Sequence, residues 1–146
     1  MYKRILVPLD GSARAEQILP HVEELALRFE SEVILLRVIE PDSVYTDFAQ
    51  IQFDLQAIER KENEAESYLA AKRDELKKMD IPVRVYRKLG DVVLAIIEIA
   101  RAEEVDLIAL ASHGRSGLAR VFYGSVASAL LQRIDRPLLL IRSGDE

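Results

Sequence analysis

The chain contains no cysteine among its 146 residues, and it has fewer basic than acidic residues. Without thiols, disulfide bonds, zinc–thiolate sites and cysteine-based catalysis are excluded. The 20 lysines and arginines face 25 aspartates and glutamates, which gives a formal net charge of -5. Nonspecific nucleic-acid binding needs a basic footprint, so we expect no nucleic-acid partner. A small anion remains compatible, because local backbone N–H groups can outweigh the global charge.

Long apolar runs are missing as well. No segment approaches the ~20 apolar residues that span a membrane, so we expect no membrane association. The first residues, Met1-Tyr-Lys-Arg-Ile5, lead straight into an apolar run without the pattern of a signal peptide. We therefore expect the protein to be cytoplasmic. Its length and its 49% hydrophobic content indicate one globular domain over residues 1–146.

The motifs of several enzyme classes are also absent. No G-x-x-x-x-G-K-S/T occurs, which excludes a Walker A site. The first apolar run leads into Asp10-Gly11-Ser12 and not into G-x-G-x-x-G, which argues against a Rossmann dehydrogenase. Histidines and carboxylates do not cluster at metal-ligand spacing, so we expect no metal site built by the protein alone. A divalent ion would have to arrive with bound phosphates.

What the sequence does contain is a regular alternation of strand and helix patterns. Short apolar runs predict strands at 5–9, 33–39, 82–89, 105–110 and 138–141. Helical periodicity predicts helices over 15–29, 51–76, 93–100 and 126–134. Pro20 inside the first helical pattern should bend it or mark its first turns. Such alternation indicates an α/β fold, a doubly wound open parallel sheet with helices on both faces. Run 82–89 alternates apolar and polar residues, which is typical of an edge strand.

A glycine-rich segment, Ala111-Ser-His-Gly-Arg-Ser-Gly-Leu-Ala-Arg-Val-Phe-Tyr-Gly-Ser-Val126, joins the fourth strand to the last helix. Glycines let backbone approach an anion, and a helix start supplies free N–H groups and partial positive charge. Gly114 would let the loop curl around phosphates, and Gly124 would clear the helix entry. Ser125 would cap the helix or donate its hydroxyl to a phosphate. Arg115 would add charge-assisted hydrogen bonds.

Each of these residues also has a purely structural interpretation. Glycines terminate turns, Ser125 can be a plain N-cap, and Arg115 can be a solvated surface residue. Asp10 after a strand is often a turn former, and only its place at the carboxyl edge of the sheet raises its functional interest. His113 suggests a general base, but no nucleophile and orienting group accompany it. We therefore assign no catalytic residue.

Three motifs in order resemble the universal stress protein family. Ile5-Leu-Val-Pro-Leu-Asp-Gly-Ser12 resembles the opening strand and turn of the family, and Arg136-Pro-Leu-Leu-Leu-Ile141 resembles its last strand. Between them, the ATP-binding fingerprint G-x2-G-x9-G-S/T falls on Ala111, Gly114, Gly124 and Ser125. The resemblance covers essentially the whole chain. The one departure within the fingerprint is its first position, where Ala111 replaces glycine.

The resemblance implies five parallel strands in the order 3-2-1-4-5, with a ligand site at the switch between strands one and four. It implies ATP as the cofactor, accompanied by Mg²⁺. The residues carried over to the adenosine side are Pro8, Leu9, Asp10, Val38, Leu110 and Ala111. Those carried over to the phosphates are His113, Gly114, Arg115, Gly124, Ser125 and Val126. A methyl at Ala111 would intrude where backbone approaches the ribose, and we expect it to weaken binding.

The chain is expected to form a homodimer through its last strand. Its residues Leu138, Leu139, Leu140 and Ile141 would otherwise leave an uncharged apolar edge, which is an aggregation liability. The family resolves this by pairing the last strands of two copies, so the resemblance implies a dimer.

The function that follows is an ATP-binding sensor or regulator of stress responses, for which an unidentified protein partner is a further expectation. One alternative is a nucleotide-free dimeric interaction module of the same family, which Ala111 favours and the intact Gly114, Gly124 and Ser125 oppose. A second alternative, which the sequence supports less, is a slow ATPase or phosphotransferase that uses His113 or Ser125.

Overall fold

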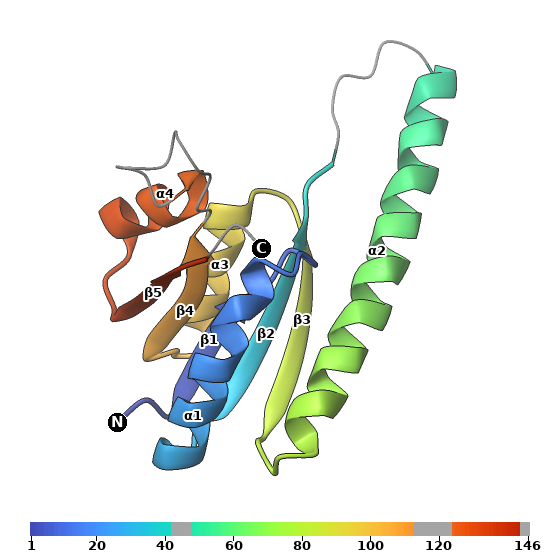
Figure 1. The fold of residues 1–146 in the computed structure, drawn as a ribbon. Helices are drawn as coiled ribbons and strands as arrows, with labels where there is room; N and C mark the ends of the chain where they lie inside the picture. Colours follow the sequence, from blue (N-terminus) through green and yellow to red (C-terminus); the bar gives the residue numbers. More distant parts are fainter. Residues whose placement is uncertain (42–47, 113–123, 144–146) are drawn as a thin grey trace.

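The computed structural model describes residues 1–41, 48–112 and 124–143. Five parallel strands form one sheet in the order β3-β2-β1-β4-β5 (Figure 1). They are β1 (Arg4–Pro8), β2 (Glu32–Ile39), β3 (Val83–Leu89), β4 (Leu107–Ser112) and β5 (Leu138–Arg142). The helical elements are a 3-10 turn η1 (Ala15–Ile18), α1 (Leu19–Phe29), α2 (Phe48–Lys77), α3 (Val92–Ala102) and α4 (Ser125–Arg133). The predicted fold class and strand order are confirmed.

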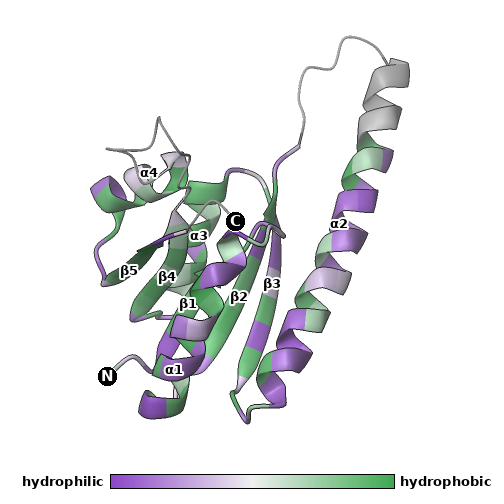
Figure 2. Cartoon of the chain, viewed as in Figure 1, coloured by the Kyte–Doolittle hydropathy of each residue, from purple (hydrophilic) through white to green (hydrophobic). Residues whose placement is uncertain are grey.

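Two apolar layers hold the sheet between its helices. The strands alternate, so odd-numbered residues of β1 and β2 face α1 and α2, as Val7 and Leu35 do. Even-numbered residues such as Leu6 and Ile34 face α3 and α4. The central strands are accordingly apolar on both faces and read as continuous hydrophobic runs, which Figure 2 shows as green ribbons inside a more polar shell.

The start of the first helix explains the position of Pro20. The chain leaves β1, forms the turn η1, and enters α1 with Pro20 in its first turn. A first-turn N–H group has no intrahelical acceptor, so proline loses nothing there. The prediction that Pro20 marks the first turns is confirmed, and the single predicted helix over 15–29 is divided into η1 and α1.

The fourth strand lies two residues further along the chain than predicted. The prediction placed it at 105–110 and assigned Ala111 to the following loop, but β4 extends to Ser112. The reason is its partner strand, since Ala111 pairs in register with Ile141 and Ser112 with Arg142. Ala111 is therefore a strand residue.

The two sheet edges differ in how they are covered. The strand β3 lies at one edge beside α2, and Arg87 forms ion pairs with Glu62 at 3.5 Å and Glu66 at 3.3 Å. The strand β5 forms the other edge, and its four apolar residues are half-buried. Within the described residues, no helix combines the length and the apolar content that crossing a membrane requires.

Candidate functional site

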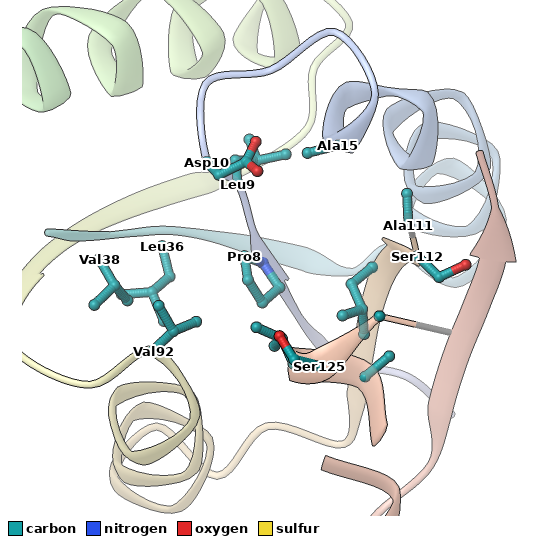
Figure 3. A pocket seen from close by; sticks show the side chains of 14 residues that line it. Pro8, Leu9, Asp10, Ala15, Leu36, Val38, Val92, Ala111, Ser112 and Ser125 are labelled. Atoms are coloured by element: carbon teal, nitrogen blue, oxygen red, sulfur yellow. The ribbon is translucent and has the colours of Figure 1, made fainter. Parts of the chain in front are cut away.

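A hollow opens at the carboxyl ends of the strands, between β1 and β4, where the chain winds away from β1 in opposite directions (Figure 3). Its volume is about 680 Å³, open solvent included. Open parallel sheets bind ligands at this switch point. The lining residues are Pro8, Leu9, Asp10, Ala15, Leu36, Val38, Val92, Leu110, Ala111, Ser112, Gly124, Ser125, Val126 and Ala127.

Every predicted site residue within the described ranges lines this hollow. These residues are Pro8, Leu9, Asp10, Val38, Leu110, Ala111, Gly124, Ser125 and Val126. The predictions for His113, Gly114 and Arg115 lie outside the described residues. The structure thus brings together four separate segments of the sequence, at 8–10, 38, 110–111 and 124–126.

Several lining residues of the hollow were not predicted from the sequence. Leu36 precedes Val38 by two positions in β2, so strand periodicity places both on the same face and would have found it. Val92 is the first residue of α3, just beyond the carboxyl end of β3, and Ala15 begins η1 beyond β1. Their place after strands at the binding edge was the available signal.

The turn after β1 forms one wall of the hollow. The Asp10 carboxylate accepts hydrogen bonds from the Ser12 backbone N–H at 2.9 Å and from the Ser12 hydroxyl at 2.6 Å. The Ser12 hydroxyl oxygen in turn accepts from the Ala15 N–H at 3.0 Å. Asp10 is therefore a turn former that also lines the hollow, so its two interpretations are compatible. This wall runs from Asp10 to Ala15, and we call it the β1 wall.

The start of α4 forms the opposite side. Ser125 was predicted to cap this helix, but it is the first helical residue, and Gly124 is the N-cap. Gly124 has φ 86° and ψ 159°, a conformation that side chains disfavour, and it offers no side-chain oxygen to the first-turn N–H groups. Those groups and the helix dipole suit an anion. Figure 3 shows Ser125 across the hollow from Asp10, with Pro8 between them.

A third side of the hollow is apolar. Val38 and Leu36 from β2 lie beside Val92 from α3 (Figure 3). The carboxylate of Asp91 caps α3 by accepting from the Leu94 N–H at 2.9 Å, which fixes the helix start that carries Val92. An apolar wall of this kind suits a flat ring, and it meets the polar α4 start across Pro8.

Ala111 contributes its methyl to the wall on the α1 side. The residue is half-buried and packs against the apolar layer under α1, whereas Leu110 belongs to the layer under α3 and α4. Figure 3 shows the Ala111 side chain directed away from Ser125. The methyl is thus part of the packed wall.

Side chains that could bind a metal ion do not cluster in the described part of the chain. Among the side chains of residues 1–41, 55–112 and 124–143, no three from histidine, aspartate or glutamate gather closely enough to hold a metal ion. The predicted route for a divalent cation, arrival with phosphates, remains a prediction.

The chain is similar in sequence to proteins of a known family. The model of the universal stress protein family matches residues 1–142. Universal stress protein MJ0577 of Methanocaldococcus jannaschii is 30% identical over 155 aligned positions, which cover 97% of this chain and 96% of that protein. Universal stress protein Sll1388 of Synechocystis is 27% identical and covers 97% of this chain and 98% of its own length.

Solved structures agree with this assignment. The structure of MJ0577 superposes with a TM-score of 0.86 at 29% identity and covers 100% of this chain and 99% of the other. The universal stress protein UspA from Lactobacillus plantarum gives a TM-score of 0.83 at 22% identity, with 97% and 98% coverage, and shows the shared fold alone.

Proposed function

The chain belongs to the universal stress protein family, and on that premise we propose that it binds ATP together with Mg²⁺ in the hollow between β1 and β4. The observation that carries the proposal is the pairing of two unlike surfaces in one cavity. The apolar wall of Leu36, Val38 and Val92 faces the same space as the start of α4. A nucleoside polyphosphate has the matching chemistry, a flat ring at one end and an anion at the other.

Each side of the hollow then has a role in binding. Val38 and Val92 pack on the base, while Leu110 and Ala111 line the ribose side. Asp10 lies on the β1 wall, where its carboxylate accepts from Ser12. Carboxylates commonly accept from ribose hydroxyls in α/β nucleotide sites, and we assign Asp10 that role toward the base or the ribose.

The phosphates are assigned to the start of α4. The N–H groups of Ser125 and Val126 belong to the first helical turn, and the helix dipole adds partial positive charge. Gly124 allows the backbone to approach the anion closely. His113, Gly114 and Arg115 complete the phosphate set in the proposal, following the fingerprint of the family. The phosphates would supply most of the ligands of the accompanying Mg²⁺.

Two proteins of the same fold support a nucleotide ligand. One universal stress protein was solved in complex with cAMP, at a TM-score of 0.66 and 18% identity. Another, from Arabidopsis thaliana, was solved with AMP bound, at a TM-score of 0.62 and 15% identity. An adenine nucleotide is therefore the first ligand class to test for this chain.

We further propose a cytoplasmic stress sensor or regulator that acts as a homodimer through β5. The strand lies at the edge of the sheet, and Leu138, Leu139, Leu140 and Ile141 are half-buried. A second β5 would satisfy the free edge and cover these side chains. A binding and assembly role agrees with the lack of an assigned catalytic residue.

The proposal is tested by looking for bound nucleotide and by titration. The purified protein is denatured, the supernatant is analysed for adenine nucleotides, and the emptied protein is titrated with MgATP in a calorimeter. The proposal predicts released nucleotide or a binding isotherm at about one nucleotide per chain. An empty protein that also gives no binding heat would overturn it and favour the nucleotide-free interaction module.

A further inference from the structure

Four side chains outside the hollow connect its β1 wall to the long helix α2. They are Glu16 from η1, Arg37 from β2, and Tyr68 and Lys72 from α2. We call this set the α2 latch. None of its members lines the hollow, yet Glu16 directly follows the lining residue Ala15, and Arg37 lies between Leu36 and Val38.

Glu16 is the centre of the latch. One carboxylate oxygen accepts a hydrogen bond from the Tyr68 hydroxyl at 2.6 Å, and the other lies 2.9 Å from the Lys72 ammonium. The Glu16 side chain is 26% exposed and that of Lys72 only 17%, so water screens this contact less than it screens a surface ion pair.

Arg37 closes the latch from the sheet side. Its guanidinium carbon lies 5.2 Å from the centre of the Tyr68 ring, and the Lys72 ammonium lies 5.7 Å from the same centre. Both distances suit cation–π attraction. The Arg37 guanidinium also packs on the turn itself, since a Cβ built on Gly11 would fall 2.6 Å from Arg37 Nη1. Gly11 has φ +87°, a backbone conformation that residues with side chains rarely adopt, so this position of the turn favours glycine.

The charge states of the latch agree with a fixed structural contact. Burial alone raises the pKa of Glu16, but the hydrogen bonds from Tyr68 and Lys72 outweigh it and leave the pKa below the ordinary value of 4.5. Burial and the Glu16 contact raise the pKa of Tyr68, and the hydrogen bond to Glu16 raises the pKa of Lys72. Near neutral pH the latch therefore holds a carboxylate, an ammonium and a neutral phenol.

A continuous set of contacts runs from the hollow to α2. The Asp10 carboxylate holds Ser12, the Ser12 hydroxyl holds the N–H of Ala15, and Glu16 next to it holds Tyr68. A shift of the β1 wall would therefore change the contacts of Glu16 with α2, and loss of those contacts would remove one restraint on the wall. The α2–β3 ion pairs of Arg87 also attach α2, but they do not touch this wall.

We propose that Glu16, Arg37, Tyr68 and Lys72 are positioning residues that hold the β1 wall in its ligand-ready conformation and thereby couple occupancy of the hollow to the packing of α2. The inference rests on the proposed function for the identity of the ligand. The coupling is reciprocal, so a bound nucleotide strengthens the packing of α2 on the sheet, and the intact latch raises the affinity for nucleotide.

The test compares two tyrosine-to-phenylalanine variants of matched chemistry. Tyr68→Phe removes the hydroxyl that bonds Glu16, and Tyr86→Phe removes a hydroxyl that bonds Glu103 at 2.5 Å, away from the hollow. Both changes keep the ring and delete one tyrosine–glutamate hydrogen bond, and Tyr86→Phe also removes the hydrogen bond that the Tyr86 hydroxyl accepts from Arg84 at 3.2 Å. Calorimetric titration with MgATP should show about fivefold weaker binding for Tyr68→Phe, the scale of one net hydrogen bond, and little change for Tyr86→Phe.

Amide hydrogen exchange supplies a second readout that does not depend on the ligand. Without nucleotide, Tyr68→Phe should exchange faster at the amides of Ser12 and Ala15, whereas Tyr86→Phe should leave those amides unchanged. With MgATP, amides of α2 around Tyr68 should become more protected in the wild type and less so in Tyr68→Phe. A purely structural role would not change this ligand-dependent protection.

The outcomes separate the latch from the proposed function. If the wild type binds MgATP and the two variants behave alike in affinity and in exchange at Ser12 and Ala15, the latch proposal is wrong and the function stands. If the wild type binds no nucleotide, the function is wrong. Exchange at Ser12 and Ala15 then decides the positioning role: faster exchange in Tyr68→Phe alone supports it, and equal exchange overturns it.

Discussion

Ala111 stands where the fingerprint of the family has glycine, and its environment determines what that methyl does. The side chain packs with the apolar layer under α1. The backbone is held in β4 by pairing with Ile141 of β5. The methyl therefore forms part of the wall of the hollow. From this packing we predict that it obstructs a ligand little, in place of the expectation that it weakens binding.

The substitution Ala111→Gly tests what the methyl does. Glycine inside a strand costs conformational entropy, so we expect the unfolding free energy to fall by about 0.5–1 kcal/mol in chemical denaturation. Nucleotide affinity should change less than about threefold, a difference below 1 kcal/mol. A gain of tenfold or more in calorimetric titration would show instead that the methyl blocks the ribose side.

Glu16 supplies a prediction about pH. The groups facing it are Tyr68 and Lys72 of α2 and Asp10 of the β1 wall. Burial raises the pKa of Glu16, but the hydrogen bonds from Tyr68 and Lys72 outweigh it, so the pKa lies below the ordinary value. A lowered pKa means that the carboxylate stabilises the fold above the unfolded value of 4.5 and that this stabilisation is lost as pH falls through the folded value. The wild type should therefore be more stable than Glu16→Gln at neutral pH.

That stability difference should shrink as the pH falls below 4.5, because the protonated wild-type side chain then resembles glutamine. Chemical denaturation of both proteins at neutral and acidic pH measures the change. A difference that is the same at both pH values would contradict the assignment of a charged Glu16 to the latch.

The strand β5 is the element through which we propose that two copies of the chain assemble. Leu139 is half-buried, packs with the layer under α1, and lies on a sheet edge. We expect Leu139→Lys to convert a dimer into a monomer, because an ammonium on that edge resists pairing with a second copy. Light scattering on the wild type and the variant measures the mass.

The matched control for this change is Leu89→Lys. Leu89 is 54% exposed and ends β3, the strand at the opposite edge of the sheet. The control should keep the wild-type mass. A monomeric wild type, or a folded Leu139→Lys protein that is still a dimer, would refute the β5 interface. Since the wild-type mass is measured first, the prediction can fail even where Leu139→Lys does not fold.

Element types could be predicted from the sequence, but some boundaries could not. The apolar run at 105–110 predicts a strand, yet its last residues are set by the register with β5, a contact between distant segments. Gly124 and Ser125 show the same limit. Serine is a common N-cap, but the conformation of Gly124, with φ 86°, makes the glycine the cap and places Ser125 inside the helix.

At the scale of the whole molecule, the path of the chain is what assembles the site. Alternating strands and helices predicted the doubly wound sheet, and the resemblance to the family supplied the order in which the strands lie. That order brings Asp10, Val38 and Ser125 to one edge. The α2 latch could not be predicted, because Glu16 and Tyr68 are 52 positions apart and neither belongs to a motif.

Amide NMR spectra recorded during titration with MgATP will show whether a nucleotide binds between β1 and β4. If it does, the largest shifts should occur at residues that line the hollow, namely Leu9, Asp10, Val38, Ser125 and Val126. Amides at the opposite end of the sheet, near Glu103, should stay in place. Spectra that do not change at saturating MgATP, or shifts confined to residues outside the hollow, would show that no nucleotide binds between β1 and β4.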